Sequence, residues 1–523
     1  MNTYRIISRS LILINFKTES KMEFEHFRLM CKISLEGNYD PVRKKWFVGN
    51  SPEDISRLQK YGFVQENKKY NPFQIILNNS TIKVKGKFED LISLHSYFVQ
   101  YNYKFCYMNG EFIYERVYRV NFSKFDDKYL ILPIGFLKDL KRFLYKNKIE
   151  FQQADLRSDL VINKEEVKRN LHYTELYDYQ TDATITCMKK KNCIVKLPTS
   201  SGKTEIFLSL CNLIPLRTLI LFNSIELAKQ TKDRANSAGL DTGLVQGDNV
   251  DEDHRVVMCT VQSAGKIKRK YKMIIVDEVH QAGTKQYWNI LKSDEFIYRF
   301  GFSATPFPKN KLRKALIKKW IGDIEYLLPA TKLIELKKIA EPHITMYKIE
   351  EPRDIYFDDG WMDAENNCII NNYYRNEIIK NIALENKFTM ILVKKIKHGE
   401  LLEKMIPGSI FIHGKSKIVD REIVKQKFIN GEIILIASRI YDQGISVNEI
   451  RCLIIAGGGL SYIVTLQRIG RGLRIMDDKD SVDIHDFIDN TNYILKDHSR
   501  NRKKDYKKEG YTKIKIIKLK RGE

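Results

Sequence analysis

Eight consecutive residues, Leu197 to Thr204, read Leu-Pro-Thr-Ser-Ser-Gly-Lys-Thr and are of the types that bind phosphate. A glycine lets the backbone approach an anion closely, a lysine neutralises its charge, and a threonine hydroxyl can ligate Mg²⁺. The apolar run before this segment predicts a strand, and the residues after it predict a helix, whose N-terminus attracts anions. The predicted phosphate and metal contacts are Thr199, Ser200, Ser201, Gly202, Lys203 and Thr204.

A pair of acidic residues, Asp277 and Glu278, directly follows the apolar run 273–276. Beside a phosphate loop, a carboxylate at the end of a buried strand can hold Mg²⁺ through water, and its neighbour can orient and deprotonate an attacking water. We therefore predict that Asp277 is a metal ligand and Glu278 the general base. His280 is predicted to couple this site to Ser303 or Gln467.

Two arginines, Arg471 and Arg474, lie three residues apart and so on one face of a predicted helix. An arginine opposite the γ-phosphate stabilises charge that develops during phosphoryl transfer. The glycines at 470 and 472 cost helix stability, which indicates tight packing at an interface. Together with the phosphate loop and the acidic pair, these arginines predict nucleoside triphosphate hydrolysis between two domains.

The composition favours a polyanionic partner. The 523 residues include 89 Lys and Arg against 65 Asp and Glu, a formal net charge of +24, and such a surplus binds DNA or RNA phosphates. None of the eight cysteines forms a Cys-x-x-Cys pair, so a zinc site is not expected and reduced, buried thiols are. No stretch approaches the roughly 20 apolar residues of a membrane span. We expect a soluble, intracellular protein.

Short apolar runs alternate with helical segments from about residue 166 onward, which is typical of buried parallel strands joined by crossover helices. The pattern restarts after about residue 341, so we predict an α/β fold with two tandem parallel-sheet domains. Residues 336–344, which include Pro342, are the expected linker. The expected domains are 1–165 (accessory α+β region), 166–340, 341–490, and a basic tail, 491–523.

The two flanking regions carry no catalytic motif. In residues 1–165, alternation predicts strands at 81–85 and 111–118, and amphipathic patterns predict helices at 88–100 and 135–145. Tyrosines interleave with Lys and Arg at 101–104 and 114–119, which fits either base stacking and phosphate contact or an aromatic core. The tail has twelve Lys and Arg against four Asp and Glu, a net of +8. We expect it to begin as a helix, to fray at its end and to contact phosphates.

Residues 170 to 490 resemble the superfamily 2 helicases of the DExH kind, through the segments above and through 177–180, 221–230, 259–262, 303–305, 393–398 and 437–446. The resemblance implies two RecA-like domains and the cofactors ATP and Mg²⁺. It implies that Tyr177 and Gln180 read adenine, that Gly444 lies at the nucleotide, and that Ser303 and Thr305 couple hydrolysis to movement. The implied nucleic-acid contacts are Asn223, Thr260, Gln262, Lys394 and Ser438.

A narrower resemblance is to the bacteriophage UvsW-like helicases. It rests on the Leu-Pro-Thr-Ser sequence at 197–200, on Gly-Ile-Ser-Val at 444–447, and on Leu-Pro-Ile-Gly at 132–135. This resemblance implies remodelling of branched DNA and R-loops in replication, recombination and repair. The implied partners are branched, duplex or R-loop DNA, with RNA also open, together with single-strand-binding or recombination proteins in a host cell.

Three alternatives stay open from the sequence. The same motor motifs serve RNA helicases, and they also serve viral transcript-release helicases and the translocating subunits of restriction enzymes. A protein of another class, a nucleotide-gated clamp on nucleic acid that turns over little, would share the binding motifs, but the presence of Glu278, Arg471 and Arg474 disfavours it. A metabolic P-loop kinase is disfavoured by the second α/β domain and the basic charge.

Overall fold

The structure is a computed structural model that describes residues 71–156, 163–350, 364–438, 449–458, 479–489 and 493–520, except positions 79, 109, 110, 127, 172, 294, 309, 415 and 512. Before residue 71 it describes only five short strands, and at 100–119 only the backbone. The chain forms two compact units. The first comprises 1–160, 283–299 and 307–323, and the second comprises 161–282, 300–306 and 324–523.

The first unit contains two five-stranded sheets. One has the order β3-β4-β2-β1-β5, and the other has the order β10-β11-β7-β6-β12. The strands of the first sheet are β1 (Thr3–Ile6), β2 (Ile12–Asn15), β3 (Asn38–Asp40), β4 (Lys45–Val48) and β5 (Val64–Gln65). Those of the second are β6 (Phe73–Leu77), β7 (Thr81–Lys85), β10 (Lys124–Asp126), β11 (Tyr129–Pro133) and β12 (Phe151–Asp155).

The second sheet of this unit buries one face because its strands alternate apolar and polar residues. Its helices are α3 (Phe88–Tyr97), the 3₁₀ turn η2 (Ile134–Phe136) and α4 (Leu137–Lys146). The same core takes in Leu312, Ala315 and Leu316 of α10 (Lys311–Trp320), and Trp288 of α9 (Lys285–Leu291) packs against it. The accessory sheet therefore shares a core with two helices that the chain adds much later.

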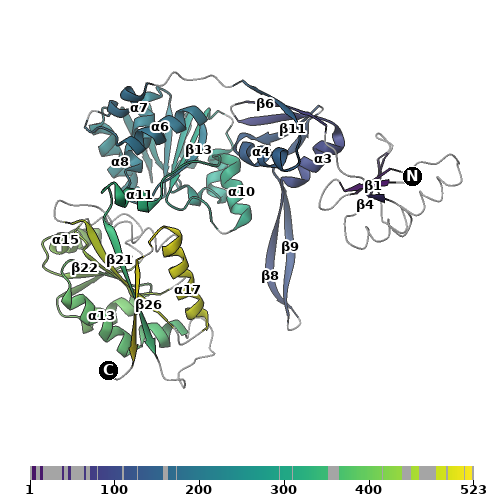
Figure 1. Cartoon of the computed structure of the whole chain (residues 1–523). Coiled ribbons are helices and arrows are strands. Elements are labelled where there is room, and N and C mark those ends of the chain that lie inside the picture. The colour runs from purple at the N-terminus through teal and green to yellow at the C-terminus, as the bar shows by residue number, and fades with distance from the viewer. Residues whose placement is uncertain are drawn as a thin grey trace, which may run out of the picture. The chain divides into compact units, whose positions relative to one another are not determined.

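A long antiparallel ribbon belongs to the same unit. It consists of β8 (Val99–Met108) and β9 (Glu111–Asn121), which pair only with each other among the described strands. Figure 1 shows the ribbon projecting away from β6, β11 and α3.

The second unit begins with an eight-stranded sheet of order β16-β15-β17-β14-β18-β19-β13-β20. Strands β14 and β17 are buried at every residue, as expected for strands covered on both faces. The strands are β13 (Asn192–Lys196), β14 (Thr218–Phe222), β15 (Thr242–Gln246), β16 (Asn249–Val250), β17 (Val256–Thr260), β18 (Met273–Asp277), β19 (Tyr298–Ser303) and β20 (Ile324–Leu327). The helices are α5 (Lys164–Arg169), α6 (Asp178–Lys190), α7 (Lys203–Leu213), α8 (Ile225–Ser237), η3 (Ala264–Lys266), η4 (Val279–Gln281) and α11 (Ala330–Glu335).

A seven-stranded sheet follows in the same unit, with the order β23-β24-β22-β25-β26-β21-β27 and every described pair parallel. Its strands are β21 (Glu341–Glu350), β22 (Thr389–Leu392), β23 (Ser409–Ile412), β24 (Ile434–Ala437), β25 (Cys452–Ile455), β26 (Ser481–Ile488) and β27 (Ile514–Lys520). Its helices are the π-helix η6 (Asn366–Ile370), α13 (Tyr373–Glu385), α14 (Ile396–Met405), α15 (Ile418–Ile429) and α17 (Tyr493–Lys508). The prediction of two tandem parallel-sheet domains is confirmed.

The C-terminal segment differs from the expected frayed tail. Helix α17 forms as expected, but β27 then pairs in parallel with β21 over seven residues. Arg502 of α17 is buried and donates to the Asp486 carboxylate at 2.9 and 3.1 Å, so this basic residue is used inside the fold. The expected linker also ends early, because β21 already begins at Glu341.

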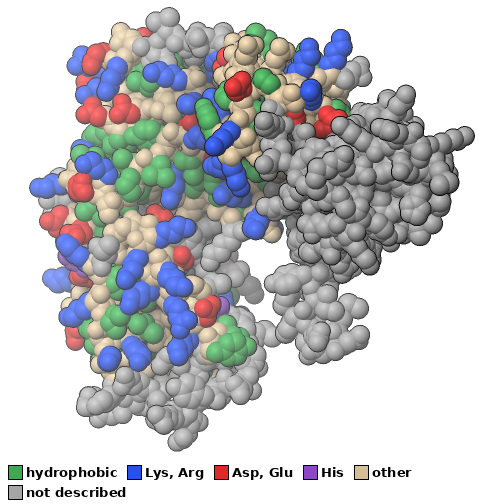
Figure 2. Space-filling model, turned by 45° about the vertical axis from the view of Figure 1, so that its right-hand side comes forward, with side chains coloured by type: hydrophobic (Ala, Val, Ile, Leu, Met, Phe, Trp, Pro, Cys, Tyr) green, Lys and Arg blue, Asp and Glu red, His purple; other side chains and the backbone are tan. Residues whose placement is uncertain are grey.

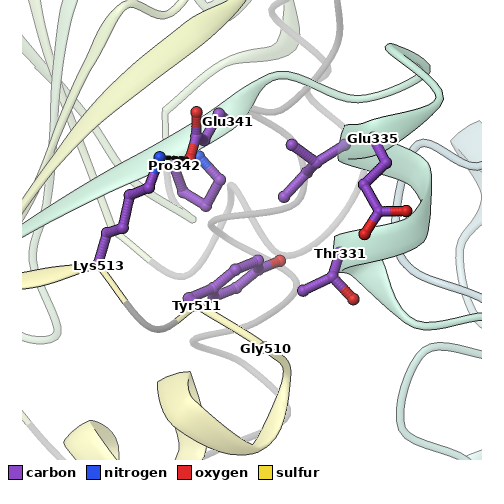
Figure 3. Close-up of a pocket in the computed structure, with 8 residues that line it drawn as sticks. Thr331, Glu335, Glu341, Pro342, Gly510, Tyr511 and Lys513 are labelled. Carbon is purple, nitrogen blue, oxygen red and sulfur yellow. Dashed lines mark hydrogen bonds and ion pairs between the residues drawn. The ribbon is translucent and has the colours of Figure 1, made fainter.

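The start of β21 and the turn before β27 enclose a small pocket together with α11 (Figure 3). Lys513 and Glu341 form an ion pair of 2.7 Å at its edge, and Tyr511 lies between them and Thr331. The backbone at Gly510 is left-handed, with φ +92°, and a Cβ there would lie 2.4 Å from Thr331 Cγ2. The C-terminal segment is thus fitted closely to the connection between the two parallel sheets.

Two further observations concern the cysteines and the helices. The six cysteines that the structure describes are free thiols, and all are buried. Of the helices in the described ranges, none is long and apolar enough to cross a bilayer.

Candidate active site

The predicted phosphate loop connects β13 to α7. Ser200 and Gly202 have left-handed backbones, with φ +64° and +71°, and α7 begins at Lys203. A left-handed conformation is open to glycine and strained for most other residues. The turn brings Thr199, Ser200 and Ser201 in front of the first turn of an 11-residue helix. Free backbone N–H groups at such a helix start bind anions.

The side chain of Lys203 folds back over the loop that precedes it. Its Nζ donates to the carbonyl oxygens of Pro198 at 2.9 Å and Leu197 at 3.4 Å, and Ser201 Oγ donates to the same Pro198 carbonyl at 2.7 Å. Phosphate binding would exchange these neutral acceptors for charged oxygens, which form stronger hydrogen bonds with an ammonium group. The lysine is therefore held beside the place where its predicted phosphate partner would bind.

The predicted adenine-reading residues contact the same loop. Gln180 is buried and its Nε2 donates to the carbonyl oxygens of Ser201 and Gly202, each at 3.3 Å, while its Oε1 accepts from the Tyr177 N–H at 2.8 Å. A Cβ at Gly202 would lie 2.2 Å from Gln180 Nε2, which explains the glycine. Tyr177 is 48% exposed.

Two residues near this element were missed from the sequence. Tyr179 donates its hydroxyl to the Ser201 carbonyl at 2.9 Å and stacks on Tyr177 with ring centroids 5.8 Å apart. Lys338, in the connection between the two sheets, places Nζ 3.8 Å from the centroid of the Tyr177 ring. Tyr179 lies inside the recognised segment 177–180, but no sequence signal points to Lys338.

The acidic pair lies at the end of β18. Asp277 is its last residue, and Glu278 has a left-handed backbone with φ +49°. Glu278 Oε2 accepts from Ser303 Oγ at 3.0 Å and lies 3.2 Å from His280 Nδ1, which is itself 3.2 Å from Ser303 Oγ. The Thr305 N–H donates to Ser303 Oγ at 3.1 Å. The structure thus brings Glu278, His280, Ser303 and Thr305 together in one hydrogen-bonded group.

The surroundings shift the pKa values of the two carboxyl groups in opposite directions. Burial and the adjacent Glu278 carboxylate raise the pKa of Asp277, and Lys203 offsets this only in part. Burial also opposes ionisation of Glu278, but the hydrogen bond to His280, the charge of Lys203 and the hydrogen bond from Ser303 outweigh it and lower the pKa of Glu278. Within this pair, the contacts of Glu278 therefore favour its ionised form.

The residues fit a magnesium ion that arrives with phosphate. The strand order β18-β19-β13 sets Asp277, Ser303 and the phosphate loop near one another at a single sheet. A hydroxyl from Thr204 and a carboxylate from Asp277 are hard oxygen donors, which Mg²⁺ uses beside phosphate oxygens and water. Within the described ranges, no group of three or more His, Cys, Asp or Glu forms a metal site by itself. A divalent cation would also supply the positive charge that Asp277 needs to ionise.

The predicted nucleic-acid contacts of the first parallel sheet follow two adjacent strands. Asn223 follows β14, and Thr260 ends β17, with Phe222 and Thr260 in register. Thr260 is buried, whereas Gln262 two residues later is exposed. In this conformation Gln262 and the partly exposed Asn223 are the accessible members of the set.

The predicted contacts of the second parallel sheet lie at equivalent strand ends. Lys394 follows β22 and Ser438 follows β24, which pair in parallel. Ser438 is buried. Lys394 Nζ lies 2.5 Å from Glu365 Oε1, and Lys395 Nζ lies 3.6 Å from Glu365 Oε2. The buried Glu365 pairs with both lysines where β22 ends. No sequence pattern indicated this glutamate. Gly444, Gln467, Arg471 and Arg474 lie outside the described residues.

Comparisons with known proteins agree with this geometry. A family model for "Type III restriction enzyme, res subunit" matches residues 173–308, and one for "Helicase conserved C-terminal domain" matches 374–476. The DNA 3'-5' translocase XPB2 of Sulfurisphaera tokodaii is 25% identical over 65% of this chain and 86% of its own. The ATP-dependent DNA helicase uvsW of Enterobacteria phage T4 is 27% identical over 72% of this chain and 82% of its own.

A likeness in fold extends to solved structures. The fragment structure of a putative HsdR subunit of a type I restriction enzyme from Vibrio vulnificus YJ016 superposes with a TM-score of 0.51. It is 14% identical, and the match covers 81% of this chain and 92% of that fragment. The segments matched by the two family models contain the phosphate loop, the acidic pair and strands of both parallel sheets. The chain therefore belongs to the superfamily 2 helicases and is an ATP-dependent helicase.

Proposed function

We propose that this helicase acts on DNA and remodels branched DNA or R-loops in replication, recombination and repair. The observation that carries the chemistry is the group formed by Glu278, His280 and Ser303 beside Lys203. The choice of DNA draws on two relatives whose names specify DNA, and the choice of branched substrates draws on the likeness to the phage helicase.

In the proposed reaction, Gln180 and Tyr177 bind the base of ATP, and the N–H groups of the loop with Lys203 bind its phosphates. Thr204, and Asp277 through water, would hold Mg²⁺, which would supply positive charge to the phosphates when bound with ATP. Glu278 accepts a proton from the attacking water. Arg471 and Arg474 are proposed to stabilise charge on the γ-phosphate, with Gln467 and Gly444 at the same site.

Coupling to movement is proposed to pass through the contacts of Glu278. Ser303 and His280 both touch the Glu278 carboxylate, so a change in its partners during hydrolysis reaches β19 directly. Asn223, Thr260, Gln262, Lys394 and Ser438 are proposed to hold one nucleic-acid strand along the ends of the strands. Lys394 would then exchange Glu365 for a phosphate.

The test is ATP hydrolysis by the full chain with no polymer, single-stranded DNA, duplex DNA, a four-way junction, an R-loop or single-stranded RNA. Strongest stimulation by the junction or R-loop supports the proposal. Stimulation by RNA alone would replace it with an RNA helicase, and binding of DNA without turnover would replace it with a nucleotide-gated clamp. Lys203→Ala controls for a contaminating ATPase, because it should abolish hydrolysis with every polymer.

A further inference from the structure

The ring of Tyr177 has a neighbour that the proposed function does not use. Lys338, in the connection between the two parallel sheets, places its Nζ 3.8 Å from the centroid of this ring. This is van der Waals contact, and the electron-rich face of the ring attracts the ammonium group. A stacked base would also lie in van der Waals contact with the ring. The ammonium group and a base therefore cannot occupy the same face of Tyr177 together.

The backbone of Lys338 is fixed by the end of α11. The Lys338 N–H donates to the Leu333 carbonyl at 2.8 Å. The preceding Lys337 N–H donates to the Ile334 carbonyl, also at 2.8 Å, and the Lys337 backbone is left-handed with φ +51°. These two bonds and the left-handed residue form a Schellman motif, a common helix C-terminus. The motif therefore sets the point from which the Lys338 side chain reaches Tyr177.

The Lys338 side chain is held less firmly than its backbone. Its ammonium group has no hydrogen bond or ion pair with any residue that the structure describes. Lys332, one turn earlier on α11, pairs with Glu335 at 3.0 Å. A lysine side chain has a flexible four-carbon stem. The Lys338 ammonium can therefore leave the ring while the backbone of the turn stays in place.

The other side chain against this ring is fixed. Tyr179 stacks on Tyr177 with ring centroids 5.8 Å apart, is 7% exposed, and donates its hydroxyl to the Ser201 carbonyl at 2.9 Å. Tyr177 itself donates its N–H to Gln180 Oε1 at 2.8 Å at the start of α6. Of the two side chains against the ring, Lys338 is the one that can move without breaking a hydrogen bond.

We propose that Lys338 competes with the base of ATP for the face of Tyr177 and so sets how much the base adds to nucleotide affinity. The inference rests on the proposed function, in which Tyr177 binds the base. A base that stacks on the ring displaces the ammonium group, and the lost attraction weakens binding by about two- to fivefold, the usual size of an exposed cation–ring contact. ADP carries the same base, so the competition also weakens retention of the product.

The sign of this effect separates competition from simple charge attraction. A lysine beside a nucleotide raises affinity for the phosphates, whereas a competitor for the ring lowers the contribution of the base. Pyrophosphate carries phosphates without a base, and ADP carries both. The dissociation constant of pyrophosphate divided by that of ADP therefore measures the contribution of the base alone. We call this quotient the base preference.

The test measures binding of ADP and of pyrophosphate, each with Mg²⁺, to the full chain by competition with a fluorescent ADP analogue. Lys338→Ala should raise the base preference about two- to fivefold, because the competitor is gone. Lys338→Arg should keep it near the wild-type value, since a guanidinium group also lies over aromatic rings. Affinity for pyrophosphate within twofold of wild type in both variants reports an intact phosphate loop.

Two further variants separate competition from a structural role. Lys332→Ala removes a lysine of the same helix that pairs with Glu335 instead of a ring, and it should leave the base preference unchanged. Tyr177→Ala should lower the base preference. Adding Lys338→Ala to Tyr177→Ala should change nothing more, because the competitor acts only through the ring. A purely structural role of Lys338 would weaken binding of ADP and pyrophosphate together.

An unchanged base preference in Lys338→Ala would overturn the inference. A lower one would also overturn it, because Lys338 would then hold the base instead of competing with it, and so would an effect that persists without the Tyr177 ring. In these cases a base preference that depends on Tyr177 leaves the proposed base contact standing. A wild type that binds pyrophosphate as tightly as ADP would instead remove that contact from the proposed function, and this inference with it.

Discussion

At the scale of single residues, Glu278 is the proposed general base, and three neighbours favour its ionised form. It accepts from Ser303, pairs with His280 and lies in the field of Lys203, and its pKa is lowered despite burial. We expect Glu278→Gln to reduce ATP hydrolysis by about 10²–10⁴-fold, because general-base catalysis contributes that much. ATP binding, measured with a fluorescent ATP analogue, should persist.

The matched control for this prediction is Glu226→Gln, which makes the same change on the exposed side of α8 and should leave hydrolysis unchanged. Hydrolysis by Glu278→Gln within threefold of wild type would show that another group activates the water.

Candidate site residues could be located from the sequence where a short segment by itself indicates a strand followed by a loop. The positions of the acidic pair and of the loop that carries Lys203 could be predicted from the sequence, because each follows an apolar run that became a strand. Lys338 and Glu365 could not, because their contacts join segments far apart: Lys338 lies over Tyr177, and Glu365 pairs with Lys394. A local sequence pattern cannot show which distant segments will be in contact.

At the scale of elements, η2 is fixed against α10 by a glycine. A Cβ at Gly135 would lie 1.8 Å from the carbonyl oxygen of Lys318, and a backbone atom cannot move aside as a side-chain tip can. Lys318 also pairs with Asp139 and Asp323, each at 2.8 Å. We expect Gly135→Ala to destabilise the first unit by about 1–3 kcal/mol, the usual cost of overpacking.

Urea unfolding followed by fluorescence would measure this change, with Gly265→Ala as control because a Cβ there meets nothing within 4 Å. The control should stay within about 0.5 kcal/mol of wild type. Equal stability of the two variants would mean that η2 and α10 are not in contact in solution. The same shared core means that removing residues 71–156 would expose Leu312 and Leu316 of α10.

Helix α14 supplies a pH-dependent contribution through His398. Burial, and then the charge of Arg375, lower the pKa of His398 from 6.5 to about 3, and its Nε2 lies 3.0 Å from Asn376 Oδ1. The unfolded chain therefore binds a proton at higher pH than the folded one. Stability from this group is complete above pH 6.5 and falls as the pH drops toward about 3, by about 1.4 kcal/mol per unit within that window.

We accordingly expect His398→Gln, whose amide can still donate to Asn376, to lose less stability than wild type between pH 7.5 and 5.5. Urea midpoints at the two pH values would show it, with His343→Gln as the control at a half-exposed histidine. Parallel losses in wild type and His398→Gln would place the acid sensitivity elsewhere.

At the scale of the whole molecule, the sequence predicted the two parallel sheets because buried strands are nearly continuous apolar runs, as in β14 and β17. It did not predict that β27 joins β21, since three lysines interrupt the apolar residues of Ile514–Lys520 and give no continuous apolar run. Nor did the sequence predict that α10 joins the core formed by residues 73–149 of the first unit. That contact joins residues about 180 positions apart, as the pair Lys318 and Asp139 shows. Long-range pairing is decided by tertiary packing that a local pattern does not encode.

The net charge of +24 sets how the whole molecule responds to salt. Lys and Arg side chains lie over much of the face shown in Figure 2, among fewer acidic ones. DNA binding that neutralises several phosphates releases counterions, so we expect affinity to fall by about 10³–10⁵-fold between 50 and 200 mM salt. Fluorescence anisotropy of labelled single-stranded DNA across this range measures the slope of log affinity against log salt.

A single lysine tests whether the second parallel sheet takes part in this binding. Lys394 lies at the end of β22, before α14, and Lys404 lies in the last turn of the same helix, at its far end. If Lys394 leaves Glu365 for a phosphate, Lys394→Ala should lower the salt slope by about 1 and weaken binding similarly for all sequences. Lys404→Ala should leave the slope unchanged, because the carboxyl ends of the strands lie at the other end of α14. Equal slopes for both variants and wild type would remove Lys394 from the DNA contact and leave its pairing with Glu365 a structural one.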